Sequence, residues 1–218
     1  MKVSSRATHP LTRKLLFDAD FCRSTERLLD AAVEIVAHLP RTTADIELLL
    51  NRAPHRLSHE VQYIVLNTLD SLPLRPVDVK RLLPTVLRLL RNLNSPTAYL
   101  WMKLGCLLGD GFLKSEDATT RKQIVSELLD ALRTARSVHA REGAFHGIEH
   151  ALNTASMSKG KKMLGVMHDV ALSDRALSIR RKAFGLLRDG YWWGNGGHPK
   201  LHTYARKQGR TLRIGDYY

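Results

Sequence analysis

The sequence predicts an all-α protein, built as a right-handed α-solenoid of about four stacked helical hairpins. Apolar runs with helical periodicity stand at residues 58–72, 95–108, 137–152 and 175–187. Their first residues follow one another at intervals of 37, 42 and 38 residues, and each interval holds a second helix-period run. A repeat near forty residues is typical of stacked helical pairs. Aromatic residues make up only 6% of the chain, which also favours an all-helical protein.

The individual elements follow from periodicity and from helix-ending residues. Residues 24–39 repeat apolar side chains at helical spacing and stop at Pro40, which predicts an N-terminal capping helix. Residues 1–20 lack clear periodicity, and we expect a partly ordered lead-in there. The hairpins that follow are predicted over residues 42–72, 76–108, 116–153 and 159–189.

Gly194, Gly196 and Gly197 predict that helical order ends after the fourth hairpin. We therefore expect two segments, a solenoid over residues 1–190 and an irregular, basic and aromatic C-terminal extension over 191–218. The extension contains six of the nine Tyr and Trp residues of the chain.

Composition limits the class of protein. Of the 218 residues, 44% are hydrophobic and 25% charged, as in folded globular domains. No apolar stretch approaches the roughly 20 residues that span a bilayer, and the N-terminal residues lack the apolar segment of a signal peptide. Cys22 and Cys106 have no paired spacing, which excludes a Cys-rich zinc module and favours a reducing compartment. We expect a cytoplasmic protein, with Cys106 as a small core residue.

The positive charge of the chain is concentrated near its C-terminus. The net charge is +13, and residues 159–218 carry thirteen Lys and Arg against four Asp and Glu. Such a field attracts polyanions or acidic protein surfaces and speeds encounter with them.

The fourth predicted hairpin resembles those of the HEAT-repeat family. Its residues LSDRALSIRRKAFGLL place Asp174 in the turn between two helices and Arg180 early in the second helix, with Ala183 and Leu186 behind them. The resemblance covers about residues 42–189, where the other hairpins share its spacing and periodicity. It implies a curved solenoid whose second helices line the concave side, and it implies no single activity.

Helical phase selects the side chains that the second helices would display on that side. In the third hairpin these are His139, His146 and His150, with Glu142 and Glu149 at their edge. The other second helices contribute His59, Tyr63, Lys103, Arg181 and Arg188. The predicted groove grades from mixed polar side chains, through a histidine patch, to arginine.

The histidine patch raises the question of a metal site. His146, Glu149 and His150 have the H-x-x-E-H form of inverted zinc peptidases, but those enzymes need a later Glu ligand and no Glu follows Glu149. The HEAT-repeat enzyme deoxyhypusine hydroxylase is similar in architecture, and its di-iron site uses four His-Glu dipeptides. This chain has one, His59-Glu60. We therefore interpret the patch as solvated polar side chains, with partner contacts as the second interpretation, and predict no metal, cofactor or catalytic residue.

The C-terminal extension supplies the remaining candidate binding residues, namely Trp192, Trp193, Lys200, Arg206, Lys207, Arg210 and Arg213. Aromatic side chains among basic ones can stack on bases while the charges hold phosphates. Alternatively the two Trp side chains cover the exposed apolar end of the last hairpin, which we favour for that pair.

Two functions remain open. The first is a non-catalytic adaptor, inhibitor or immunity-type factor that holds an acidic protein in its groove and tail. The second is a nucleic-acid-binding protein, since the HEAT-like alkylpurine DNA glycosylases bind duplex DNA with a similar architecture. The nearby carboxylates, Asp174 and Asp189, lie at predicted helix ends and match a glycosylase poorly. We favour the protein partner, and expect neither a membrane nor a small-molecule substrate.

Overall fold

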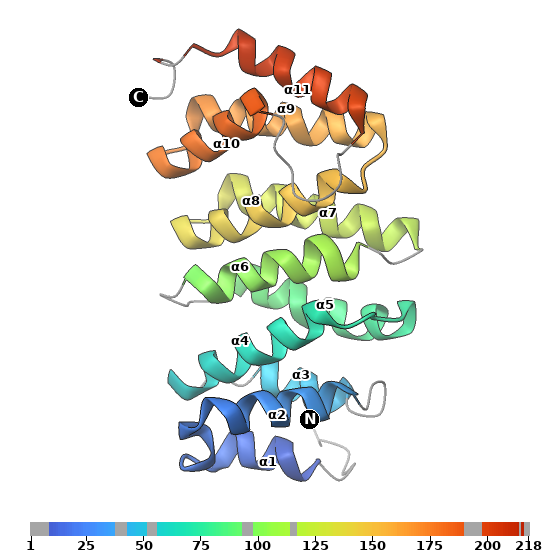
Figure 1. The fold of residues 1–218 in the computed structure, drawn as a ribbon, viewed down its shortest axis with the longest axis vertical. Helices are drawn as coiled ribbons and strands as arrows, with labels where there is room; N and C mark the ends of the chain where they lie inside the picture. Colours follow the sequence, from blue (N-terminus) through green and yellow to red (C-terminus); the bar gives the residue numbers. More distant parts are fainter. Residues whose placement is uncertain are drawn as a thin grey trace.

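The structure, a computed structural model, describes residues 9–37, 43–51, 56–92, 98–113, 117–189, 198–213 and 215. All regular elements within these ranges are helical, which confirms the all-α prediction. The helices stack along the long axis of the molecule, from α1 (Pro10–Phe17) and α2 (Thr25–Ala37) at one end to α11 (Pro199–Thr211) at the other (Figure 1). None of the helices in the described ranges has both the length and the apolarity that a membrane crossing requires.

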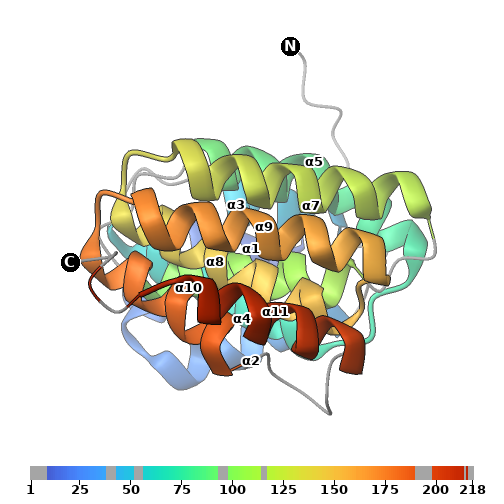
Figure 2. The same ribbon diagram turned by 90° about the horizontal axis from the view of Figure 1, so that it is seen from above.

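The helices predicted over residues 42–189 are present close to the expected positions. They are α3 (Thr43–Asn51) with α4 (Arg56–Ser71), α5 (Pro76–Asn92) with α6 (Ala98–Cys106), α7 (Ala118–Thr134) with α8 (Val138–Asn153), and α9 (Met157–Ser173) with α10 (Leu177–Asp189). Contacts join α2, α4, α6, α8 and α10 in succession, and likewise α3, α5, α7 and α9. The molecule therefore has two layers of helices, which Figure 2 shows from above.

The core lies between the two layers, because each helix turns an apolar stripe toward the other layer. In α2, the stripe is formed by side chains at helical spacing, namely Leu28, Ala31, Ala32, Ile35 and Val36. Full burial of a side chain such as Ile35 contributes about 1.5–3 kcal/mol.

Polar residues define several helix starts. Asp117 accepts a hydrogen bond from the backbone N–H of Thr119 at 2.9 Å, and Ser137 accepts one from Ala140 at 3.4 Å.

The expectation of a partly ordered lead-in is wrong for residues 10–17, which form α1. Pro10 occupies the first turn, where its missing N–H costs nothing, and Leu15 is buried. The backbone N–H of His9 donates to Asp45 Oδ1 at 3.2 Å and ties the start of α1 to α3. Because α1 packs against α2, the predicted capping helix is instead the second helix of a further pair.

The expectation of an irregular C-terminal tail is wrong for residues 199–211, which form α11. This helix packs on α9 and α10 and covers the end of the stack (Figure 1). Its buried face has a four-residue period, with Leu201 against Gly160 of α9 and Gly209 against the backbone of Arg188 in α10. Trp192, Trp193 and the predicted boundary after residue 190 lie outside the described residues. Within the described residues, α11 covers the last pair of helices.

The turn between α9 and α10 is fixed to α8 by a buried ion pair. Arg141 Nε and Nη2 donate to the carboxylate of Asp174 at 2.9 and 3.1 Å, and both side chains are almost fully buried. Arg180 donates a hydrogen bond to the backbone carbonyl oxygen of Asp174 at 2.5 Å. Moving α10 away from α8 would separate the two buried charges. A buried charge left without its partner destabilises a fold by about 3–5 kcal/mol, so the pair holds α10 in a defined position beside α8.

Helices α6 and α8 approach each other through glycines. Gly105 of α6 faces Gly143 of α8, and Gly109, in the π-helix η2 (Leu107–Phe112) that continues α6, faces Gly147. A Cβ on Gly105 would lie 2.9 Å from the carbonyl carbon of Gly143, and closer still to its oxygen. On each segment the two glycines are four residues apart and so share one face. The two backbones are therefore in direct contact, with no room for side chains between them.

Replacing Gly105 by Ala is expected to destabilise the protein by roughly 3 kcal/mol, because neither backbone can yield without separating α6 from α8. Gly165 is the matched control, since a Cβ there meets nothing within 4 Å. Gly165→Ala should stabilise α9 by about 0.5–1 kcal/mol. Free energies of unfolding in urea measure both effects. Equal effects of the two substitutions would contradict the close contact.

Replacing Leu201 by Ala should cost about 3 kcal/mol, because the Leu201 side chain is fully buried between α11 and α9. Leu172 is a matched control on α9, with 42% of its surface exposed. Leu172→Ala should change the free energy of unfolding by less than about 0.5 kcal/mol. A Leu201→Ala variant as stable as this control would show that α11 does not dock in solution.

Candidate functional site

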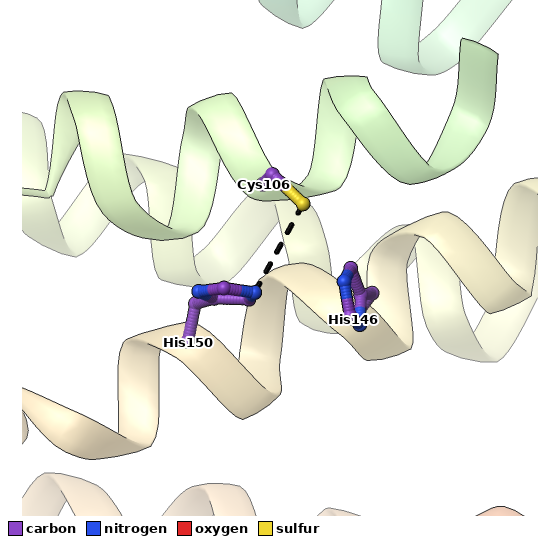
Figure 3. A group of neighbouring side chains, drawn as sticks. All are labelled: Cys106, His146 and His150. Carbon is purple, nitrogen blue, oxygen red and sulfur yellow. Dashed lines mark hydrogen bonds between the residues drawn. The ribbon is translucent and has the colours of Figure 1, made fainter. Parts of the chain in front are cut away.

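The glycine contact brings three chemically reactive side chains together (Figure 3). Cys106 directly follows Gly105 on α6, and His146 and His150 flank Gly147 on α8. Cys106 Sγ lies 3.9 Å from Nε2 of His150. The two imidazole rings are edge to face, with centroids 4.8 Å apart and planes at 81°. We call Cys106, His146 and His150 the Cys–His cluster; one nitrogen or sulfur atom from each lies within 4.8 Å of the others.

Each histidine of the cluster is oriented by a carboxylate. Asp110 Oδ2 lies 2.5 Å from Nδ1 of His150, and Glu149 Oε2 lies 3.0 Å from Nδ1 of His146. Asp110 belongs to η2, whose wider π-helical turn continues α6 past the cluster. Both contacts use Nδ1, so Nε2 of each ring is left for another partner.

Hydrogen bonding within the cluster shifts the protonation of its members. Burial raises the pKa of Cys106, but hydrogen bonds from His146 and His150 outweigh burial and lower the pKa to about 7. The hydrogen bond with Cys106, followed by that with Glu149, raises the pKa of His146 to about 9. The hydrogen bond with Asp110, followed by that with Cys106, raises the pKa of His150 to about 10. Slightly above neutral pH the cluster therefore holds a thiolate beside protonated imidazoles.

These positions correct the interpretation of the histidine patch as a solvated face. The His146 and His150 side chains are only 20% and 16% exposed. His139 lies seven residues before His146 on the same helix and is 39% exposed, with a contact to Glu142 Oε2 at 3.4 Å. It fits the interpretation as a solvated side chain better. Cys106 is buried as predicted, but its sulfur faces polar groups. The recurrence of glycine at a four-residue spacing in both α6–η2 and α8 was the sequence signal for this contact.

A cleft lies beside the cluster, between α8 and α10, and we call it the α8–α10 cleft. Its volume is about 380 Å³, and it is lined by Met102, Glu142, Phe145, His146, Glu149, Lys182, Gly185, Leu186 and Asp189. Lys182 Nζ lies 3.0 Å from Glu142 Oε1, which links the two helices across the cleft. The cleft is therefore partly apolar and carries charges of both signs.

The other predicted binding residues are spread over several helices. His59 and Tyr63 lie half-buried on α4, and Lys103 Nζ of α6 lies 3.4 Å from Asp70 of α4. Arg181 and Arg188 are exposed on α10, where Arg188 Nε lies 2.7 Å from Asp189. The basic residues of the C-terminal segment are exposed on or just after α11, namely Lys200, Arg206, Lys207, Arg210 and Arg213.

Comparison with known proteins gives no relative. No protein-family model, no curated protein and no solved structure matches this chain. Function is therefore inferred from the side chains themselves.

The thiol of Cys106 should lose its proton as the pH rises through about 7. Cys22 should ionise at a much higher pH, because burial raises the pKa of its thiol. The ultraviolet absorbance of the thiolate in Cys22→Ser protein, held in a chelator, measures this titration. A Cys22→Ser/Cys106→Ser variant provides the background from tyrosine.

The same titration in a His146→Gln/His150→Gln background tests the cause of the shift. Without the imidazoles only burial remains, so the midpoint for Cys106 should move upward, above the ordinary thiol range. An unchanged midpoint near neutral pH would contradict the role of the two histidines.

Proposed function

We propose that this protein is a non-catalytic binding module, a HEAT-like right-handed solenoid that holds an acidic protein partner. The partner would lie along the face formed by α6, α8 and α10 and extend onto the basic end at α11. The α8–α10 cleft, open beside a strongly cationic end of the stack, is the observation that carries this proposal.

The composition of the face suits a protein partner. Met102, 39% exposed, gives the cleft an apolar surface above the almost fully buried side chains of Phe145 and Leu186, and charged side chains surround it. Tyr99, one turn before Met102 on α6, is 72% exposed. Aromatic and methionine side chains are enriched in the centres of protein–protein interfaces, within a polar rim.

The charge of the adjoining end suits an acidic partner. From Arg175 to Arg213, the described residues include ten Lys and Arg and a single carboxylate residue, Asp189. On α11, Lys200, Arg206, Lys207 and Arg210 are all exposed. A positive surface of this density raises the rate of encounter with a negative one and disfavours basic partners.

Nucleic acid is the alternative, and the cations of α11 favour it, because such groups also bind phosphates. Glu142, Glu149 and Asp189 oppose it, because they line the cleft and would repel a continuous phosphate backbone, whereas a protein can place apolar side chains in the cleft and its acidic ones at α11. A DNA glycosylase would need a catalytic carboxylate near the arginines. Asp174 is buried and bound by Arg141, and Asp189 pairs with Arg188, so neither is placed for that role.

Charge reversal on α11 tests the proposal. The protein is used to capture a partner from nuclease-treated lysate, and the affinity for the isolated partner is then measured. Lys207→Glu/Arg210→Glu should weaken binding about tenfold, since two reversed surface charges are worth roughly 1–2 kcal/mol. Met102→Asp, which places a charge in the apolar part of the cleft, should weaken it further.

The control is Arg13→Glu/Arg27→Glu, which reverses two exposed charges on α1 and α2 at the opposite end of the stack. This variant should bind as the wild type does. Loss of all partners after nuclease treatment, together with a gel shift of DNA or RNA that Lys207→Glu/Arg210→Glu abolishes, would assign the nucleic-acid function instead. Equal effects of the α11 variant and the control would overturn both assignments.

A further inference from the structure

We propose that Cys106, His146 and His150 form a binding site for one Zn²⁺ ion, with the sulfur of Cys106 and Nε2 of each histidine as ligands. The site borders the α8–α10 cleft, but the proposal does not depend on the binding of a partner there. Thiolate sulfur and imidazole nitrogen are the ligands that Zn²⁺ prefers in proteins. Among the described residues, this is the one group of three or more potential ligands found close enough together.

The distances suit an ion of this size after a small adjustment. The sulfur of Cys106 and one ring nitrogen of each histidine lie within 4.8 Å of one another, and Sγ of Cys106 is 3.9 Å from Nε2 of His150. Zinc–ligand bonds of about 2.0–2.3 Å require neighbouring ligand atoms roughly 3.5 Å apart. Side-chain rotations that move these atoms by about 1 Å achieve this. The backbones need not move, because the glycine contact already fixes Cys106 beside α8.

The two carboxylates provide a second, independent indication. A metal-bound histidine almost always donates the N–H of its other ring nitrogen to a carboxylate or a carbonyl group, which fixes the ring and its tautomer. Asp110 contacts Nδ1 of His150, and Glu149 contacts Nδ1 of His146, so both rings have this arrangement. The more exposed His139 makes a similar but longer contact with Glu142, at 3.4 Å, within the same helix. The contact of Asp110 with His150 joins two different elements and is therefore the more specific of the two.

The carboxylates of Asp110 and Glu149 place negative charge beside the two imidazole rings, which also suits a cation. Zn²⁺ binds thiolate sulfur and neutral imidazole, so its binding would release protons from these ligands.

The site has three protein ligands and one side toward the α8–α10 cleft, since His146 and Glu149 also line that cleft. Zinc sites with three protein ligands keep a fourth position, which a water molecule fills. Glu149 contacts His146, so its role here differs from that of the Glu in inverted zinc peptidases.

Titration with Co²⁺, a spectroscopic substitute for Zn²⁺, tests the proposal in the full chain. The wild type should bind one Co²⁺, with the visible bands of four-coordinate cobalt and a thiolate-to-cobalt charge-transfer band. One equivalent of Zn²⁺ should remove both. Cys106→Ser should lose the charge-transfer band, whereas Cys22→Ser, which changes the other cysteine, should keep it.

Variants of the histidines and carboxylates complete the test. His146→Gln and His150→Gln should each abolish the four-coordinate spectrum, and His139→Gln, on the same helix, should leave the affinity unchanged. Asp110→Asn and Glu149→Gln should keep the spectrum but weaken binding about 10–100-fold. Circular dichroism confirms that each variant is folded. If Cys106→Ser does not fold, the two histidine variants decide the outcome.

Absence of a charge-transfer band in the wild type at micromolar Co²⁺ would overturn the proposal. So would a band that Cys106→Ser retains. Weak binding of equal strength in the wild type and in a His146→Gln/His150→Gln variant would mean that only adventitious surface histidines take up the metal, and would overturn it too.

Discussion

The backbone contact between α6 and α8 determines most of what is distinctive in this structure. Gly105 and Gly109 face Gly143 and Gly147, and no side chain fits between the two helices. In an ordinary helix pair, a layer of interlocking side chains separates the axes by about 8–10 Å. Removing that layer places the side chain next to Gly105, the thiol of Cys106, directly among the residues of α8. The chemistry of the site is thus a consequence of four missing side chains.

The same contact connects the cluster with the face that we propose for partner binding. His146 and Glu149 belong to the Cys–His cluster and its carboxylates, and they also line the α8–α10 cleft. On the other side of the cleft, α10 is held by the Arg141–Asp174 pair and is covered by α11. Helix α10, held in place on both sides, therefore lies next to the positively charged helix α11. A binding surface of this kind presents its side chains to a partner in fixed positions.

Periodicity in the sequence predicted α2 to α10, because these helices bury apolar side chains at helical spacing. It missed α1 because an eight-residue helix offers too few repeats to show a period. It missed α11 because a Gly-rich segment precedes it and its buried face is made of Leu201, Ala205 and Gly209, two of which are small. The Cys–His cluster was missed for another reason. Helical periodicity identifies one apolar face of α8 as buried, but α8 also contacts α6 along a second face, which is lined with glycines.

A crystal structure of the protein grown with Zn²⁺ and recorded at the zinc absorption edge would show the helix contact and the Cys–His cluster together. We expect Gly105 against the backbone of Gly143, and an anomalous peak bonded to the sulfur of Cys106 and to one nitrogen of each imidazole. Side chains packed between α6 and α8, with the Cys106 sulfur turned away from His146 and His150 and no peak between them, would contradict this expectation.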